Sequence, residues 1–236
     1  MIGQSTACSA APVELVYPDR RPQAEYYRAL LRNLGCGEGA ASQLPGLVGV
    51  TSCSRREGVS TVAMNLARQT AVETDERTLV IDMSPTQNSM MGLLGGRAAC
   101  GLSDMLLRGA RPSQCIKQIH DANCRGEQGV AVLGIGSLPI ELASSIDRRQ
   151  LGKLFQGLRV IYPLIVVDLP PANETSYCYE LAGILDGMLL VVQAERVPAR
   201  IAERVKDQLV QVDGKLLGVV FNKRPEYVPE WLSARL

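Results

Sequence analysis

Residues 51–67, TSCSRREGVSTVAMNLA, decide the fold of this chain. The stretch continues an apolar run and leads into an apolar-periodic segment, so it predicts a strand, a loop and a helix in succession. A phosphate-binding loop of the form G-x-x-x-x-G-K-[ST] has this plan, with a lysine between its last glycine and its hydroxyl residue. Here Gly58 and Ser60 flank Val59. The sequence therefore predicts a nucleotide-type loop that lacks the charge for gripping the β- and γ-phosphates.

The rest of the chain repeats an alternation of strand-like and helix-like segments. Apolar runs without polar alternation, separated by helices, indicate parallel strands that are buried on both faces. The predicted fold is a doubly wound α/β class, a mostly parallel sheet flanked by helices, whose ligands bind at the carboxyl ends of the strands. The predicted strands are 47–52, 78–82, 130–136, 163–171, 187–194 and 215–222, and the predicted helices are 22–34, 60–73, 101–109, 147–158, 174–185 and 198–212.

Length and composition narrow the class of protein. A chain of 236 residues with 46% hydrophobic residues suits one α/β domain with a large core. The net charge of +1 and the 4% aromatic content argue against a nucleic-acid-binding surface. No apolar stretch approaches the ~18 residues of a membrane span, and the N-terminus lacks the pattern of a signal peptide. We expect a cytoplasmic protein that a partner could hold at a membrane.

The chain divides into four parts by composition. Residues 1–21 are small, polar and proline-containing, and predict a loose N-terminal tail. Residues 22–45 comprise an amphipathic helix and a linker rich in Gly, Ala and Ser. Residues 46–225 carry the α/β pattern, and residues 226–236 form a short C-terminal tail.

The seven cysteines have an odd count and no C-x-x-C spacing. Reduced thiols therefore fit better than a disulfide framework. Cys115, His120 and Cys124 lie close together in the sequence, but no fourth ligand is evident, so ordinary thiols are favoured over a zinc site.

Polar groups at several predicted strand ends converge on one edge of the sheet. Ser60 is placed to ligate Mg²⁺ through its hydroxyl group, although it could instead cap the helix. Asp82 and Asp168 each end an apolar strand and could hold Mg²⁺ and orient a nucleophile, or act only as turn residues. Asn222 ends the last strand and could pair with a base edge. The predicted nucleotide-binding residues are Ser54, Arg55, Arg56, Glu57, Gly58, Val59, Ser60, Thr61 and Asn222.

Further motifs follow the loop in a fixed order. They read EYYRALLRN (25–33), LVIDMSPTQN (79–88), GLSDML (101–106), GSLPIELASS (136–145), IVVDLPP (165–171), DGMLLVV (186–192) and GVVFN (218–222). With the loop, this ordered set resembles the bacterial tyrosine kinases of capsule and exopolysaccharide synthesis, within the MinD/ParA-like group of P-loop proteins, over about residues 22–224. The resemblance implies a P-loop kinase domain over 46–225 and an oligomerisation helix that contains Glu25, Arg28 and Arg32.

The departures from the family pattern bear on activity. Val59 replaces the loop lysine, Arg55 and Arg56 replace a Pro-Gly pair, and Ser84 replaces the second Asp of a D-x-D motif. Leu31 replaces the second arginine of the oligomerisation motif, and the family's C-terminal tyrosine cluster is absent. Loss of one preorganised transition-state donor typically costs about 10²–10³ in rate, so the departures favour inactivity. The opposing interpretation is that one arginine of the loop reaches the phosphates instead.

Three functions follow as hypotheses from the resemblance. The first is a catalytically degraded, kinase-like regulator that docks on the cytoplasmic part of an inner-membrane polysaccharide co-polymerase or export protein, as a homo- or hetero-oligomer. The second is an active ATP-dependent tyrosine autokinase. The third is a MinD/ParA-like positioning ATPase whose tail, PEWLSARL (229–236), lies on a membrane. The cofactors implied are ATP or ADP with Mg²⁺, if the site still binds them.

Overall fold

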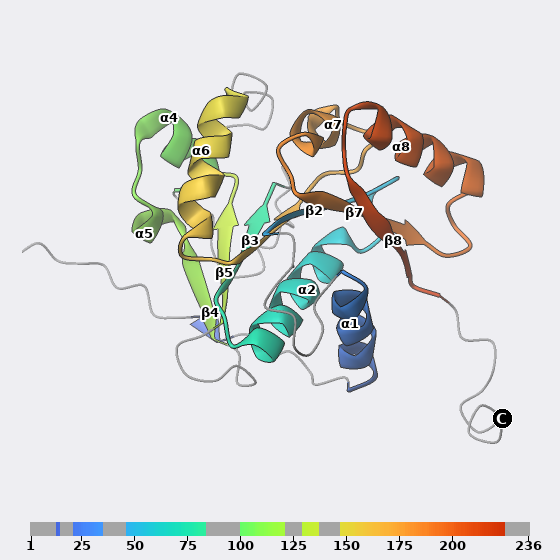
Figure 1. Ribbon diagram of the computed structural model, residues 1–236, viewed down its shortest axis with the longest axis horizontal. Helices are drawn as coiled ribbons and strands as arrows, with labels where there is room; N and C mark the ends of the chain where they lie inside the picture. The colour runs from blue at the N-terminus through green and yellow to red at the C-terminus, as the bar shows by residue number, and fades with distance from the viewer. Residues whose placement is uncertain are drawn as a thin grey trace, which may run out of the picture.

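The structure is a computed structural model of the chain. It describes residues 13–14, 21–34, 46–83, 100–120, 129–136 and 147–224. Within these ranges the chain forms one sheet with helices on both faces (Figure 1).

The sheet has eight strands in the order β1-β4-β5-β3-β6-β2-β7-β8. All neighbouring strands pair in parallel except β4 and β5, which are antiparallel. The predicted doubly wound, mostly parallel fold is therefore confirmed. The strands are β1 (Val13–Glu14), β2 (Leu47–Ser52), β3 (Thr78–Asp82), β4 (Lys117–His120), β5 (Val130–Gly134), β6 (Leu164–Asp168), β7 (Gly187–Gln193) and β8 (Leu216–Asn222).

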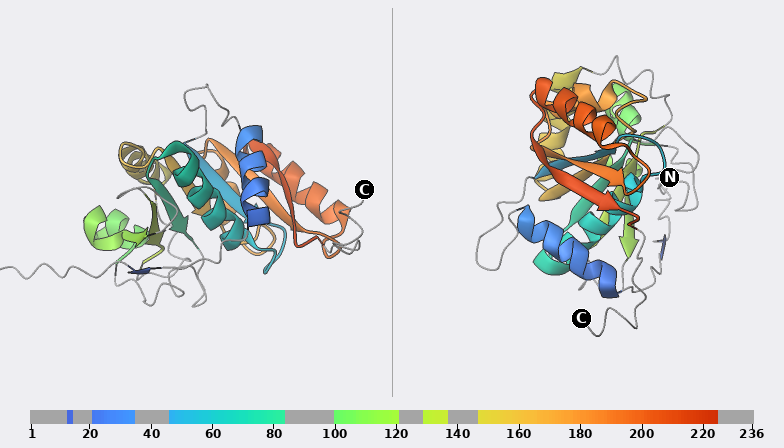
Figure 2. Two further views of the ribbon diagram at one scale, coloured as in Figure 1. Left: turned by 90° about the horizontal axis from the view of Figure 1, so that it is seen from below. Right: turned by 90° about the vertical axis from the view of Figure 1, so that its right-hand side faces the viewer.

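Two layers of helices cover the sheet. Helices α1 and α2 lie side by side on one face, whereas α6, α7 and α8 cover the other (Figures 1 and 2). Each central strand is buried along its whole length, because helices exclude water from both faces. The helices are α1 (Arg21–Asn33), α2 (Val59–Thr74), α4 (Leu102–Arg108), α5 (Pro112–Cys115), α6 (Arg148–Arg159), α7 (Tyr177–Ala182) and α8 (Ala199–Gln211).

Helix α1 packs against the body of the domain. Leu31 is 2% exposed and belongs to the apolar cluster between α2 and the sheet, and Tyr27 and Leu30 pack against the same cluster. Leu31 is the residue that replaces an arginine of the family pattern. Its burial shows that this position of α1 contributes to the core of the same chain.

The connection between β3 and β5 was the least predictable part of the fold. Sequence periodicity missed the four-residue helix α5 and the strand β4, because elements this short carry almost no periodic signal. Sequence periodicity also missed β1, a two-residue strand that pairs with β4. β1 lies within residues 1–21, which the sequence predicted to be a loose tail.

The expectation of reduced thiols throughout was wrong for one pair of cysteines. Cys100 and Cys115 form a disulfide, with their Cα atoms 4.7 Å apart. Helices α4 and α5 bring the two residues together, and sequence spacing alone does not reveal this proximity. Since Cys115 is bonded to Cys100, its sulfur is not available as a zinc ligand, and Cys124 lies outside the described residues.

Candidate nucleotide site

The loop between β2 and α2 has the backbone shape of a phosphate cradle. Gly58 takes a positive φ of 98° at the start of α2, which glycine adopts without strain. A Cβ atom at this position would lie 2.1 Å from Nδ2 of Asn222, so the site has no room for one. Arg56 also has a positive φ, 67°, and stands where the family pattern has glycine. The conformation expected of that glycine is therefore retained by a residue that adopts it at a cost of about 1 kcal/mol.

Four consecutive loop carbonyls, those of residues 54–57, each accept a hydrogen bond from a side chain outside the cradle. This pattern turns the carbonyl oxygens away from the cradle, and the loop amides of residues 55–58 have no acceptor among the described residues. Free amides and the start of a helix together favour an anion. The donors are Ser52 Oγ to Ser54 O (2.7 Å), Arg196 Nη1 to Arg55 O (3.4 Å), Lys223 Nζ to Arg56 O (2.5 Å) and Asn222 Nδ2 to Glu57 O (2.8 Å).

Glu57 ties the loop to the neighbouring strand. Its side chain is fully buried and accepts hydrogen bonds from the amides of Ser54 (2.5 Å) and Gln193 (3.0 Å). Burial raises the pKa of Glu57, while these two bonds and the charges of Arg196 and Lys223 oppose the rise. Glu57 therefore shapes the loop, and its carboxylate points to backbone amides of the protein itself.

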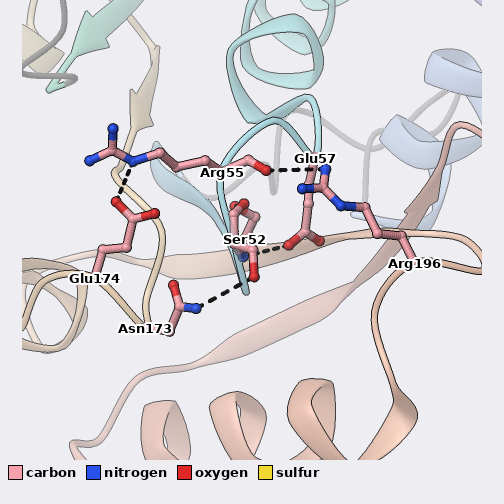
Figure 3. A network of polar contacts seen from close by, with 7 residues as sticks. Ser52, Arg55, Glu57, Asn173, Glu174 and Arg196 are labelled. Carbon is pink, nitrogen blue, oxygen red and sulfur yellow. Dashed lines mark hydrogen bonds and ion pairs between the residues drawn. The ribbon is translucent and has the colours of Figure 1, made fainter.

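Arg55 does not take the place of the missing lysine. Its Nε lies 2.5 Å from Oε2 of Glu174, and the side chain extends away from the loop toward that carboxylate (Figure 3). Asn173 approaches Ser54 from the same segment, with Nδ2 3.4 Å from Oγ. The interpretation that Arg55 reaches bound phosphates therefore finds no support in this arrangement.

Two aspartates and a serine gather below the cradle. Asp82 and Asp168 are register partners on the adjacent strands β3 and β6, and both are at most 3% exposed. Burial raises the pKa of Asp168 to about 7, the neighbouring Asp82 raises it too, and a hydrogen bond with Ser60 opposes both. Oδ2 of Asp168 has no hydrogen-bond partner within the described part of the chain. A buried, unpartnered carboxylate oxygen beside a second carboxylate favours a bound cation.

These three side chains suit Mg²⁺, which is held by few protein ligands, better than a metal ion whose ligands all come from the protein. The described ranges contain no cluster of three His, Cys, Asp or Glu side chains that could hold a metal. Mg²⁺ typically takes one or two carboxylates and completes its shell with water and substrate phosphates. Asp82, Asp168 and the hydroxyl of Ser60 supply such a partial set.

Val59 and Asn222 both contact other parts of the protein. Val59 is half-buried and packs against the apolar cluster under α1 and α2, so no cation stands at the position of the loop lysine. Asn222 donates to the loop and accepts from the amide of Lys223 (2.9 Å), so its amide group already holds backbone. Thr61 is exposed in the first turn of α2.

The predicted partner residues lie away from the cradle, on α1. Glu25, Arg28 and Arg32 are exposed, and Nε of Arg28 pairs with Glu73 of α2 at 2.7 Å. Sequence reasoning missed Arg196 and Lys223 at the loop. Their only signal was a position within a few residues of a predicted strand end.

No protein-family profile matches the chain. The sequence is 26% identical over 205 residues to the tyrosine-protein kinase CpsD of Streptococcus agalactiae, covering 86% of this chain and 84% of that one. It is 28% identical over 205 residues to the putative tyrosine-protein kinase CapB of Staphylococcus aureus, covering 86% and 85%. The chain is related to the bacterial tyrosine kinases. It also matches the succinoglycan biosynthesis transport protein ExoP of Rhizobium meliloti, at 25% identity over 80% of this chain but only 24% of ExoP.

Several solved structures have the same fold as this chain. The chimerical protein CapA2B2 superposes with a TM-score of 0.71 at 24% identity, covering 86% of this chain and 85% of the other. The kinase domain of the Escherichia coli tyrosine kinase ETK gives 0.71 at 22% identity, covering 88% and 79%. MinD of Pyrococcus horikoshii, solved with Mg-ADP, gives 0.55 at 19% identity, covering 80% and 75%. The P-loop, MinD/ParA-like architecture expected from the motifs is therefore confirmed.

Within the described ranges, no helix is long and apolar enough to span a membrane. Ser84, the segment 137–146 and the tail 229–236 lie outside these ranges, so their predicted roles stay predictions.

Proposed function

We propose that this protein is a catalytically degraded tyrosine-kinase relative that regulates capsule or exopolysaccharide biosynthesis and export by binding. The observation that carries the proposal is Val59, which packs into an apolar cluster at the position where a phosphate-gripping lysine is required. Loss of one such donor costs about 10²–10³ in rate, and Arg55, which could have replaced it, is paired with Glu174. The names of the relatives support the process, since they include tyrosine-protein kinases and a succinoglycan biosynthesis transport protein.

We propose that the site still binds Mg²⁺ with ADP or ATP, as a ligand and not as a phosphoryl donor. The outward-turned carbonyls of residues 54–57 leave amides for phosphate oxygens. Asp82, Asp168 and Ser60 would hold the metal, which would neutralise phosphate charge when bound.

The partner we propose is the cytoplasmic part of an inner-membrane polysaccharide co-polymerase or export protein. ExoP supports this, because this chain matches only a quarter of that longer transport protein. Glu25, Arg28 and Arg32 on α1 are the proposed contact residues for a homo- or hetero-oligomer. The protein would then lie at the inner face of the plasma membrane through its partner.

The deciding experiment measures phosphotyrosine and nucleotide binding on the same purified protein. We expect Mg-ADP binding in calorimetry and no transfer of radiolabelled γ-phosphate to tyrosine. Val59→Lys is the matched variant that restores the family residue. Mg²⁺-dependent phosphotyrosine in the wild type that disappears in Asp168→Ala would replace this proposal with an active autokinase.

Partner docking is tested with the soluble cytoplasmic part of a candidate export protein. We expect Glu25→Ala, Arg28→Ala and Arg32→Ala together to weaken its binding at least tenfold, while Lys153→Ala on the opposite face has no effect. Binding to anionic liposomes without the export protein would favour a MinD/ParA-like positioning ATPase instead.

A further inference from the structure

Lys223 places an ammonium group on the loop that has lost its own lysine. Its Nζ lies 2.5 Å from the carbonyl oxygen of Arg56, although the two residues are 167 positions apart. If Gly58 carried a Cβ atom, Cε of Lys223 would lie 4.0 Å from it. The amine therefore contacts Arg56 of the loop, and the side chain passes close to Gly58, the residue just before the substituted Val59.

The backbone at the end of β8 is arranged to bring this amine to the loop. Lys223 has a φ of 54°, the left-handed conformation that residues with a Cβ adopt at a cost. The side chain of Asn222 accepts a hydrogen bond from the Lys223 amide at 2.9 Å and stabilises this turn. The same Asn222 side chain donates to Glu57 O at 2.8 Å, so the two residues hold adjacent carbonyls of the loop.

Among the described residues, Lys223 Nζ makes no hydrogen bond besides the one to Arg56 O. An ammonium group carries three donors, so two remain. The side chain is also exposed.

We propose that Lys223 takes over the electrostatic role of the missing loop lysine and acts as a positioning residue for the phosphates of a bound nucleotide. It holds the Arg56 carbonyl outward, so the amide on the other side of that peptide plane points into the cradle. It also adds a positive charge next to the site where phosphate charge collects. This inference rests on the nucleotide binding proposed above and concerns how the loop achieves it.

The alternative is that Lys223 only stiffens the loop. A stiffening role would change the binding of every ligand of the site to a similar degree. An electrostatic role depends on phosphate charge, is screened by salt, and is retained by arginine. These three properties separate the two roles.

The experiment is calorimetric titration of the full chain with Mg-ADP and, separately, with adenosine. We expect Lys223→Met to weaken Mg-ADP binding at least tenfold, more at low salt than at high salt, with little change for adenosine. Lys223→Arg should remain within about threefold of wild type. Lys215→Met removes a lysine just before the other end of β8 and should have no effect. Val59→Lys in the Lys223→Met background should restore binding, which would show that the loop is still folded.

Three outcomes overturn the inference. Equal Mg-ADP binding by wild type and Lys223→Met shows that the amine contributes nothing. A parallel loss of Mg-ADP and adenosine shows a structural role. Binding by Val59→Lys but not by wild type shows that Lys223 does not substitute. If neither protein binds Mg-ADP, the nucleotide part of the proposed function fails as well, whereas the docking part is decided by the export-protein titration.

Discussion

The outer and inner sides of the loop at residues 54–60 differ sharply. On the outer side, side chains from β2, β8 and the segment after β7 hold four consecutive carbonyls. On the inner side, amides and two buried aspartates stand with no lysine at position 59. The shape of a phosphate cradle is thus maintained by contacts that do not include the residue most directly concerned with phosphate chemistry.

This difference teaches that the shape and the charge of a P-loop are separable. The shape depends on hydrogen bonds to neighbouring strand ends and on a glycine at position 58. The charge at position 59 depends on one side chain, which a single substitution removes. This chain accordingly keeps the fold of its kinase-domain neighbours although valine stands at the position of the loop lysine.

The largest expected change in the free energy of unfolding comes from the inner side of the loop, where Asp168→Asn should stabilise the protein. The pKa of Asp168 is about 7 in the folded protein against 3.8 as its ordinary value, so the folded state binds the proton more tightly. Stability contributed by this group is present at acidic pH and falls as the pH rises between those two values. At pH 8, removing the charge should raise the free energy of unfolding by up to about 4 kcal/mol. Urea unfolding across this pH range measures the gain, with Asp207→Asn on α8, where the side chain is 64% exposed, as the control. An unchanged stability of Asp168→Asn would contradict the raised pKa.

Glu57→Ala should destabilise the loop, because it removes the buried side chain that ties the loop to β7. The change leaves the amides of Ser54 and Gln193 without their shared acceptor in a buried site. Each unsatisfied buried amide costs about 1–3 kcal/mol, so we expect a loss of about 3 kcal/mol. Thermal unfolding measures it, and Glu57→Gln, which keeps one acceptor oxygen, should lose about half as much.

Gly58→Ala should disturb the contacts on the outer side of the loop, because it displaces the side chain of Asn222. The new Cβ atom would meet Nδ2 of Asn222 at 2.1 Å and would stand on a backbone with φ of 98°. We expect a loss of about 2 kcal/mol, from strain and from the lost hydrogen bond to Glu57 O. The matched control is Gly152→Ala, an open position on α6 with no atom near its Cβ, where alanine should be neutral or stabilising. Equal stability of the two variants would refute the steric argument.

Arg55→Ala should have the smallest effect. Its ion pair with Glu174 is exposed, with side-chain exposures of 64% and 30%. Such pairs contribute about 0–1 kcal/mol. We also expect Mg-ADP binding to stay within twofold of wild type. A large loss of binding, seen by calorimetry, would revive the interpretation that Arg55 supplies the missing phosphate contact.

Much of the fold could be predicted because its signals are local. The runs that became β2, β3, β6 and β7 are apolar without interruption, and such runs lie in the middle of parallel sheets. The short elements α5, β1 and β4 could not be predicted, since two to four residues carry no usable period. The Cys100–Cys115 disulfide escaped prediction for a related reason, because it depends on how those short elements pack.

For the site, the sequence by itself determined that a phosphate-type loop is present, that Val59 stands at its lysine position, and that Asp82 and Asp168 each end an apolar strand. Each of these is a local pattern at a fixed spacing. Only the tertiary structure decided which side chains surround the loop. The sheet order β6-β2-β7-β8 brings residues from the end of the chain to a loop near its start, as it does with Lys223 and Arg56. Hydrophobic periodicity specifies strands and helices, but contacts between their ends depend on strand order, which no local pattern records.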